Sequence, residues 1–249
     1  MDHAIKLIVY EEAASTQDIA RELAQAGEQG PVAVMALKQT AGRGRSGRSW
    51  ISPPGKNLAL SALLRPKLAP REAPLIGLLA SVAVAAALDA KGVPSVSLKW
   101  PNDVLVDGKK IAGILPEASV KGDSLEFVII GIGLNVNSRL SDFPPELHDS
   151  VTSVLLATGE EWDLRDAARG LLREMDALHI RVNEEGCGFV PYFWETRWAH
   201  KGRILTRDGL EGRAEGIGPL GSLILRTADG RRVEINSGQA EPIGVETAS

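Results

Sequence analysis

The stretch that decides the fold is Gln39-Thr40-Ala41-Gly42-Arg43-Gly44-Arg45-Ser46-Gly47-Arg48-Ser49-Trp50. Glycines alternate with arginines here, and no hydrophobic period runs through the segment, so it predicts neither a regular helix nor a regular strand. Glycine lets a backbone approach a ligand closely, and arginine presents a planar fork of donors suited to carboxylate and phosphate. The segment therefore predicts a mobile loop that closes over an anion, followed by an exposed indole.

Two other interpretations compete with this one. Charged, glycine-rich segments are often solvated loops, but no acidic residue lies between Lys38 and Trp50, and this density of positive charge favours a binding loop. Gly42, Gly44 and Gly47 also match the G-x-G-x-x-G spacing of dinucleotide-binding loops, which requires a helix to begin at the loop. Two consecutive prolines follow within six residues of the last arginine, so no regular helix can begin there. The dinucleotide interpretation is therefore rejected.

The composition is that of an ordinary globular protein. The chain has 249 residues, of which 44% are hydrophobic and 24% are charged, enough for one large domain or for one large and one small domain. A net charge of −4 argues against a general binder of nucleic acid or membrane surfaces, so the arginine loop is a local positive site. The single cysteine, Cys187, excludes a disulfide framework and a cysteine-based metal site and favours the reducing cytoplasm. No metal site is predicted in the protein itself, because the histidines show no ligand spacing: His3, His148, His179 and His200.

The periodicity predicts an α+β domain. Apolar runs predict strands at residues 5–10, 32–37, 57–64, 96–100, 104–106, 110–115 and 125–130, and helices are predicted from the N-cap Ser15 and over residues 73–88, 164–182 and 189–199. The helix at 73–88 carries no charged residue before its end, but its sixteen residues fall short of the roughly 20 that span a bilayer. It is therefore predicted to be a buried core helix, with no membrane contact.

The character of the chain changes near His200. Short β-like runs follow at residues 203–206, 213–217, 223–226 and 232–235, separated by turns rich in glycine. Turns at this spacing predict a small β-barrel. We therefore expect two domains, residues 1–200 and residues 201–249.

A second group of polar residues surrounds one predicted hairpin. Lys99, Asn102 and Asp103 belong to the segment Lys-Trp-Pro-Asn-Asp, and Lys109 and Lys110 follow an Asp-Gly turn. The alternative is a solvated surface hairpin, but apolar neighbours favour partial burial of at least one lysine, and a buried lysine needs an anionic partner. The arginine loop is cationic and cannot supply it. Two positive groups therefore predict a polyanionic ligand.

The chemistry expected of such a site is electrostatic. The sequence contains neither a Gly-x-Ser-x-Gly elbow nor a Gly-x4-Gly-Lys-Ser/Thr loop. Attack of a carboxylate on the α-phosphate of a nucleotide needs little more than positioning and fixed positive charge on the phosphoryl oxygens. A reaction of this kind fits the residues best.

Four motifs in this order resemble those of biotin protein ligases (biotin–[acetyl-CoA-carboxylase] ligases). They are Gly-Arg-Gly-Arg-Ser-Gly-Arg-Ser-Trp from Gly42, Lys-Trp-Pro-Asn-Asp from Lys99, Lys-Ile-Ala-Gly-Ile-Leu from Lys110 and Gly-Ile-Gly-Leu-Asn from Gly131. The resemblance covers essentially the whole chain. It implies an α+β, mixed-sheet catalytic domain related to class II aminoacyl-tRNA synthetases and lipoate ligases, followed by an SH3-like β-barrel.

The resemblance also implies the reaction and the residues that perform it. Biotin and MgATP, the metal ion being carried by the nucleotide, would give biotinyl-5′-AMP, and biotin would pass to one lysine of a biotin carboxyl carrier domain. The catalytic residues would be Arg45, Lys110 and Asp103. The residues that bind biotin would be Ser15, Thr16, Gln17, Gln39, Arg43, Gly44, Arg45, Lys110, Gly113 and Leu115, and those on the ATP and adenylate side would be Arg45, Arg48, Trp50, Lys99, Asn102 and Asn135.

Three features depart from the family pattern. Gln17 stands where asparagine is usual, which changes the reach of the amide. Pro116 stands where an apolar strand residue is usual, and it predicts a bulge or a sheet edge. Residues 238–243 lack an arginine often found near the end of the chain, which removes an expected nucleotide contact from the small domain.

Partners beyond the substrates are expected as follows. Ser15 comes too early in the sequence for the winged helix-turn-helix of bifunctional members, so a ligase without DNA-binding or repressor activity is expected. The oligomeric state stays open, a homodimer through a valine-rich edge strand such as residues 125–130 being one arrangement.

Two alternative functions are retained. A lipoate–protein ligase or octanoyl transferase shares the fold and the carrier-domain acceptor but would not be expected to carry the Gly/Arg loop. A non-catalytic nucleotide- or RNA-binding module would use that loop without chemistry. The net charge of −4 and the eleven aromatic residues (5 Trp, 2 Tyr, 4 Phe) argue against this module, since base-stacking platforms need aromatic side chains.

Overall fold

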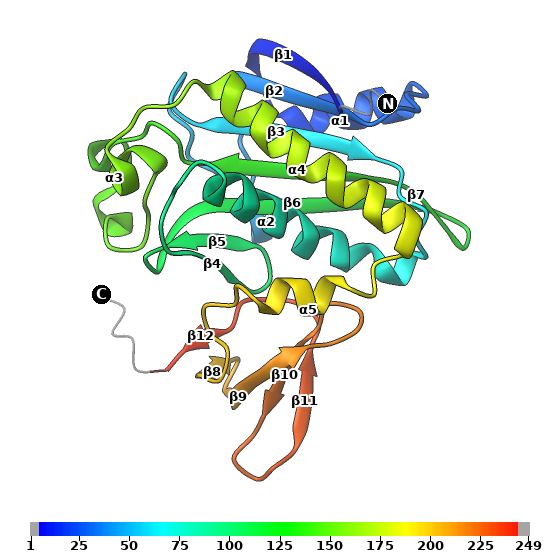
Figure 1. Cartoon of the computed structure of the whole chain (residues 1–249), viewed down its shortest axis with the longest axis vertical. Helices are drawn as coiled ribbons and strands as arrows, with labels where there is room; N and C mark the ends of the chain where they lie inside the picture. The colour runs from blue at the N-terminus through cyan, green and yellow to red at the C-terminus, as the bar shows by residue number, and fades with distance from the viewer. Residues whose placement is uncertain (1–4, 244–249) are drawn as a thin grey trace.

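The computed structural model describes residues 5–243, so His3 and the outer ends of both predicted domains, residues 1–4 and 244–249, lie outside the described part. Figure 1 shows a large layered domain with a smaller β domain attached. The elements in chain order are β1 (Lys6–Ala13), α1 (Thr16–Gln25), β2 (Val32–Gln39), η1 (Arg45–Gly47), β3 (Leu58–Leu64), η2 (Pro70–Glu72), α2 (Ala73–Asp89), β4 (Val96–Lys99), β5 (Asp103–Val106), β6 (Lys109–Lys121), β7 (Ser124–Leu134), η3 (Leu140–Asp142), η4 (Pro145–Leu147), α3 (Val154–Thr158), α4 (Leu164–Glu185), α5 (Val190–Glu195), β8 (Ile204–Arg207), β9 (Leu210–Ile217), β10 (Leu223–Arg226), β11 (Arg232–Ile235) and β12 (Glu241–Pro242).

A seven-stranded mixed sheet forms the centre of the large domain. Its order is β1-β2-β3-β7-β6-β5-β4, with β1 and β2 parallel and the remaining neighbours antiparallel. The predicted α+β class with a mixed sheet is therefore confirmed. The Asp-Gly turn also forms as predicted, because Asp107 and Gly108 both adopt positive φ, at 49° and 77°, which closes a tight β5–β6 hairpin.

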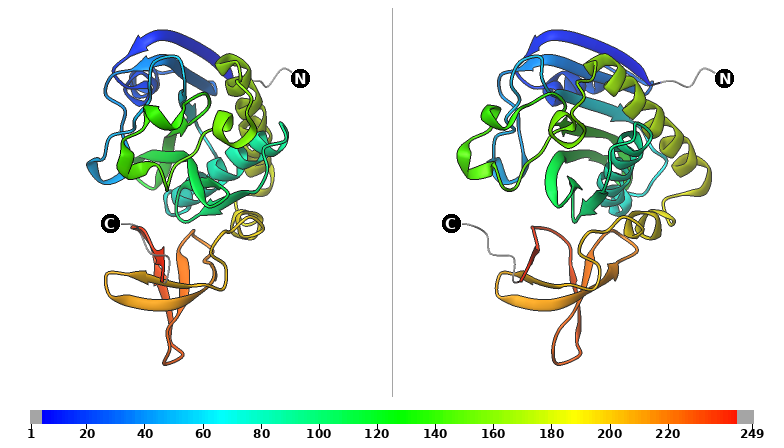
Figure 2. Two further views of the ribbon diagram at one scale, coloured as in Figure 1. Left: turned by 90° about the vertical axis from the view of Figure 1, so that its left-hand side faces the viewer. Right: turned by 60° about the vertical axis from the view of Figure 1, so that its left-hand side comes forward.

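The two faces of this sheet are covered unequally. On one face α2 and α4 pack over alternate strand residues such as Met35, Leu60 and Ile130, in one continuous core. On the other face α1 packs over a smaller cluster that includes Val34 and Ile129. Figure 2 shows α4 and α2 together on one side of the sheet and α1 on the opposite side. Because α1 is short, part of its face of the sheet remains for the functional site.

Helix α2 is the one helix of the described chain that is long and apolar enough to cross a membrane by length and composition. In the span Pro70–Asp89, 67% of the apolar window is buried inside the protein. The helix contacts β4 to β7 and packs beside α4. The predicted core helix is therefore confirmed.

The small domain is a five-stranded antiparallel sheet in the order β11-β10-β9-β8-β12. It joins the large domain through one buried and one partly buried hydrogen bond. Trp100 Nε1 donates to Gly221 O at 3.0 Å, and the Ile217 amide donates to Glu195 Oε1 at 2.8 Å. Figures 1 and 2 show this domain beneath α5 and the β4–β5 edge. The predicted β-domain is confirmed, while the division at residues 200 and 201 stays a prediction.

The structure corrects some expectations from the sequence. Residues 125–130 do not form an edge strand, because β7 lies between β3 and β6 in the middle of the sheet. The helix predicted at 189–199 is shorter, spanning Val190–Glu195. Pro116 pairs with Ile130 of β7 on one side only. The pairing of β6 with β5 ends at Gly113, so Pro116 lies at an edge of the sheet, and no bulge occurs at this residue. An edge position accommodates the missing amide of proline.

Candidate functional site

The Gly/Arg segment folds back on itself as a small hairpin, residues 42–50, which we call the lid. Gly44 N donates to Arg48 O at 2.7 Å, and Trp50 N donates to Gly42 O at 3.0 Å. The tip is the single 3₁₀ turn η1. The absence of a regular helix or of a long strand agrees with the sequence prediction, and the glycines permit the tight return. The hairpin thus brings its two ends, Gly42 and Trp50, side by side.

Trp50 ends the lid, and its indole lies on the sheet. Gly113 of β6 and Gly133 of β7 face each other in register. A Cβ atom placed on Gly133 would lie 2.2 Å from Trp50 Cε2, and one placed on Gly113 would lie 3.0 Å from Trp50 Cζ3. Only glycine leaves room for the ring at Gly133. The predicted exposed indole is therefore wrong: the glycine pair forms a seat for it, and the buried Nε1 has no hydrogen-bond partner within residues 5–243.

Lys110 and Asp103 form the charged centre of the site. Lys110 Nζ lies 2.7 Å from Asp103 Oδ1, and the same ammonium lies 5.6 Å from the centre of the Trp50 ring. The ammonium approaches Oδ1 outside hydrogen-bond alignment, so that oxygen keeps unused accepting capacity among the described residues. The chain itself supplies a carboxylate for each of these lysines, Asp103 for Lys110 and Glu241 for Lys99, the latter at 2.6 Å. Neither lysine therefore depends on a ligand for its counter-ion.

Arg45 reaches from the lid to the wall of the site. Its Nη1 donates to Asn102 Oδ1 at 3.1 Å, and Asn102 is itself held by donation from Nδ2 to Ile114 O. Burial lowers the pKa of Arg45, and the carboxylate of Asp103 opposes that effect. Arginine remains charged at neutral pH in any protein setting, so Arg45 is a half-buried cation, and no carboxylate within residues 5–243 pairs with it directly.

Polar side chains gather at the start of α1, and we call this group, residues 15–17 with Gln39 and Ser61, the polar cluster. Ser15 occupies the N-cap position with extended backbone, φ −150° and ψ 130°, as predicted, but its hydroxyl makes no capping hydrogen bond. The cap comes instead from Gln39, whose Oε1 accepts from Thr16 N at 2.9 Å and from Thr16 Oγ1 at 3.2 Å. Thr16 Oγ1 also lies 2.8 Å from Ser61 Oγ. The buried hydroxyl of Ser15 is thus left for another partner.

Gln17 extends the polar cluster toward β6 and β7. Its Nε2 donates to Leu115 O at 3.0 Å and to Glu117 Oε1 at 3.1 Å. A Cβ atom on Gly131 would lie 2.9 Å from Gln17 Oε1, so the amide rests on the glycine of β7. The longer side chain that departs from the family pattern is therefore accommodated by a glycine and anchored by two acceptors.

The other predicted residues have the following positions. Arg43 and Arg48 diverge at the two sides of the lid: Arg43 donates to Asp18 at 2.7 and 3.0 Å, and Arg48 Nη2 donates to Gln239 Oε1 at 3.2 Å. The polar atoms of Asn135 are engaged by the protein, since Nδ2 donates to Thr152 O at 3.0 Å. Its Oδ1 accepts from the buried Asn57, at 3.4 Å. The remaining predicted residues converge on the α1 face of the sheet.

Sequence reasoning missed residues that touch this constellation, among them the charged or amide side chains of Asp18, Arg21, Glu117, Gln239 and Glu241. Signals for three of them were present. Asp18 and Arg21 lie one helical turn apart beside Gln17, and Glu117 follows Leu115 by two residues and therefore points to the same face. The two residues of the small domain carry no local signal, because only the tertiary contact of the domains brings them to the site.

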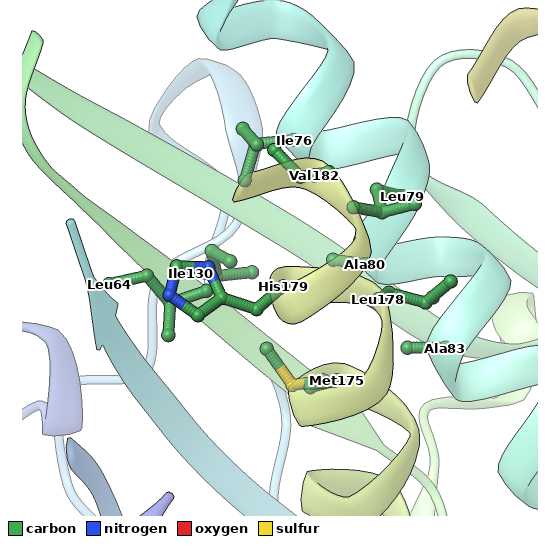
Figure 3. A pocket seen from close by; sticks show the side chains of 10 residues that line it. All are labelled: Leu64, Ile76, Leu79, Ala80, Ala83, Ile130, Met175, Leu178, His179 and Val182. Atoms are coloured by element: carbon green, nitrogen blue, oxygen red, sulfur yellow. The ribbon is translucent and has the colours of Figure 1, made fainter. Parts of the chain in front are cut away.

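Two cavities of the large domain lie on the opposite face of the sheet, which α2 and α4 cover. The one in Figure 3 is lined by side chains of α2, α4, β3 and β7, including His179 and Met175, and has a volume of about 20 Å³. That is room for a single water molecule at most. The other, of about 400 Å³, lies between α2 and α4 beside Trp162. Neither is lined by a residue of the lid.

Comparison with known proteins agrees with this geometry. The chain matches the Biotin/lipoate A/B protein ligase family over residues 10–135 and the biotin protein ligase C-terminal domain over residues 203–241. It is 38% identical to the bifunctional ligase/repressor BirA of Bacillus subtilis over 228 residues, covering 90% of this chain and 70% of that protein. It is 35% identical to the biotin–[acetyl-CoA-carboxylase] ligase of Paracoccus denitrificans, covering 83% and 89%.

Solved structures give the same answer. The biotin protein ligase of Aquifex aeolicus, in complex with biotin and ATP, superposes with a TM-score of 0.78 at 30% identity, covering 95% of this chain and 97% of that one. The match extends over both the mixed sheet and the small β domain, and the two family matches fall on the same two units. The chain therefore belongs to the Biotin/lipoate A/B protein ligase family, and within it to the biotin protein ligases.

Proposed function

We propose that the chain activates biotin with MgATP to form biotinyl-5′-AMP and pyrophosphate, and then transfers biotin to one lysine of a biotin carboxyl carrier domain. The observation that carries this proposal is that the lid reaches both parts of the site. Arg45 donates to Asn102 beside the Lys110–Asp103 pair, and Arg43 donates to Asp18 beside the polar cluster at Thr16. The Aquifex relative, with biotin and ATP in its complex, supports the choice of substrates.

In the first step a carboxylate oxygen of biotin attacks the α-phosphorus of ATP, and the bond from that phosphorus to the bridging oxygen of pyrophosphate breaks. Negative charge builds on the phosphoryl oxygens, so fixed cations stabilise the transition state. Lys110 is placed between Asp103 and the Trp50 ring, and Arg45 faces it from the lid. These two cations would supply that stabilisation, and the lid would exclude water from the mixed anhydride.

In the second step the amine of the acceptor lysine attacks the acyl carbon, an amide bond forms and AMP leaves. The amine has an unperturbed pKa of about 10.4 and must lose its proton before it attacks. Asp103 is a buried carboxylate with one oxygen outside hydrogen-bond alignment, so it would orient the amine or accept its proton.

Biotin-dependent exchange of pyrophosphate into ATP tests the first half of the proposal. Exchange that requires biotin is expected, and its absence would contradict the proposed adenylation. Lipoate in place of biotin tests the alternative ligase, and an RNA- or nucleotide-binding module would give no exchange with either. Arg45→Gly is expected to release the adenylate faster and to biotinylate proteins indiscriminately. Tight retention of the adenylate in that variant would refute the role of the lid.

The acceptor protein, the cellular location, the lack of DNA binding and the oligomeric state each need a separate test. Transfer to an isolated carrier domain tests the acceptor class, and the buried free thiol of Cys187 fits a cytoplasmic setting. The absence of repressor activity stays a prediction, and a gel shift that shows specific operator binding would overturn it. A homodimer stays open, but residues 125–130 cannot mediate it by edge pairing, because β7 is central.

A further inference from the structure

A continuous network of charged and polar contacts connects the lid to the polar cluster at the start of α1. Arg43 of the lid donates to both oxygens of Asp18, at 2.7 and 3.0 Å, and Arg21 donates to the same carboxylate at 2.8 Å. Arg21 also pairs with Glu117 on β6. Glu117 in turn accepts from the Gln17 amide at 3.1 Å. None of these contacts depends on a bound ligand.

The four charged groups of this network neutralise one another only when all four are present. Two arginines, Arg21 and Arg43, share the single carboxylate of Asp18, and Glu117 supplies the second negative charge. The hydrogen bond from Arg43 lowers the pKa of Asp18, so that carboxylate is ionised at neutral pH. If the charge of Glu117 were removed, two guanidinium groups would compete for one carboxylate, and the hold on the lid would weaken.

Glu117 also fixes the orientation of the Gln17 amide. Both amide hydrogens are donated, one to Leu115 O and one to Glu117 Oε1. The remaining polar atom, Gln17 Oε1, is therefore an acceptor beside Gly131. An acceptor held in this way suits an N–H donor of a substrate, such as the two that a ureido ring carries.

We propose that Glu117 is a positioning residue that couples the two parts of the site, aligning the Gln17 amide for the substrate ring and, by neutralising Arg21, allowing Asp18 to hold Arg43 and the lid. The ring-binding half of this inference rests on the proposed function, whereas the lid-holding half does not. The lid contains three arginines, Arg43, Arg45 and Arg48, so trypsin reports its opening in the protein without substrates.

The experiment compares Glu117→Gln, Arg21→Met and the double variant, with Glu126→Gln as the matched control. Glu126 lies on the neighbouring strand β7, and its carboxylate accepts from Ser119 rather than from this network of contacts. Glu117→Gln is expected to speed tryptic cleavage of the lid about 3- to 10-fold, the range for loss of a charge-assisted contact. In the Arg21→Met background, Asp18 and Arg43 form a neutral pair by themselves, so the additional Glu117→Gln change is expected to have no effect on cleavage.

The substrate arm is read from the kinetics of pyrophosphate exchange. Glu117→Gln is expected to raise the KM for biotin about 3- to 10-fold while the KM for ATP stays within about twofold, which general destabilisation would not produce.

Lid cleavage equal to that of the parent chain, or an increase that persists with Arg21→Met, would overturn the coupling. A rise in the KM for ATP alone would overturn the alignment of Gln17. If Glu117→Gln does not fold, Asp18→Asn must still expose the lid. A parent chain without biotin-dependent exchange would refute the proposed function and leave the cleavage result standing.

Discussion

Lys110 Nζ lies 2.7 Å from Asp103 Oδ1, and the Asp103 side chain is only 8% exposed whereas that of Lys110 is 32% exposed. The cation is thus held on the open side of a buried carboxylate, where it can turn to a second anion without leaving the first. In the proposed function this arrangement would let one pair serve both half-reactions, with Lys110 toward the phosphoryl group and Asp103 toward the acceptor amine. The two roles can be separated by substitution.

Asp103→Asn is expected to impair transfer far more than adenylation. The amide keeps the shape of the carboxylate but cannot accept a proton, while Lys110 keeps its charge beside the Trp50 ring. Transfer from preformed adenylate to a carrier domain is expected to slow by about 100-fold, and pyrophosphate exchange by less than about threefold. Single-turnover measurements of the two steps check this, and equal losses in both would refute a role of Asp103 in transfer.

Gly133→Ala is expected to displace the lid. A Cβ atom there would lie 2.2 Å from Trp50 Cε2, so the indole must leave its seat. The emission of Trp50, obtained as the difference from the Trp50→Phe variant, is expected to shift to longer wavelength, and adenylate retention is expected to shorten about tenfold. Gly170→Ala in α4, where nothing lies within 4 Å, is the control and should stabilise the fold by about 0.5–1 kcal/mol. Unchanged emission in Gly133→Ala would contradict the seat.

Glu241→Gln is expected to improve ATP binding. Lys99 is predicted to serve the nucleotide, but its ammonium is held by Glu241 of the small domain at 2.6 Å. A polyphosphate that approaches Lys99 must also approach this carboxylate. Because the pair is partly exposed, removal of the negative charge should lower the KM for ATP by about two- to fivefold, with the KM for biotin unchanged. The difference should diminish at high salt. A higher KM for ATP would mean that Glu241 acts chiefly by holding the domains together.

Cys187 is expected to be chemically silent in the folded protein. Burial, with the Glu72 carboxylate nearby, raises the pKa of its thiol from 9.0 to about 12, and Sγ lies 3.3 Å from Glu72 Oε1. At pH 8 the thiolate is therefore scarce and inaccessible, and a disulfide reagent should modify Cys187 only after denaturation. The pKa of this thiol is higher in the folded protein than in the unfolded chain. The contribution of the protonated thiol to the folding free energy is therefore fully present below pH 9.0 and is lost as the pH rises toward about 12. Rapid modification of the native protein at pH 8 would contradict this.

Local signals were enough to predict much of the fold. The β-branched run before Gly131, the Asp-Gly turn and the uncharged helix at 73–88 all form where the sequence predicts them, since each is decided by periodicity or by turn chemistry. The position of β7 was not predictable in the same way. An apolar strand reads alike at an edge and at the centre, and only pairing with β3 and β6 distinguishes them.

The residues of the site likewise divide into those that local sequence predicts and those that only the tertiary fold brings together. The lid and the charged hairpin were recognisable because glycine, arginine and lysine cluster along the chain. The seat of Trp50 was not, because Gly113 and Gly133 become one surface only after β6 and β7 pair. Glu241 and Gln239 reach the site from a separate sheet, and no pattern near them in the sequence indicates that contact.

The unequal covering of the central sheet has a consequence for how the chain tolerates change. Along β7, Val128, Ile130 and Ile132 face the α2–α4 core, whereas Gly131 and Gly133 face the site. Neighbouring positions of this part of β7 are therefore constrained either by core packing or by the substrate site. A saturation scan of residues 130–133 should alternate with a period of two, lowering protein abundance at Ile130 and Ile132 and substrate turnover at Gly131 and Gly133. Ile129 packs under α1 and should behave as a core position. Sequence drift could then remodel the substrate face without weakening the layer that keeps the protein folded.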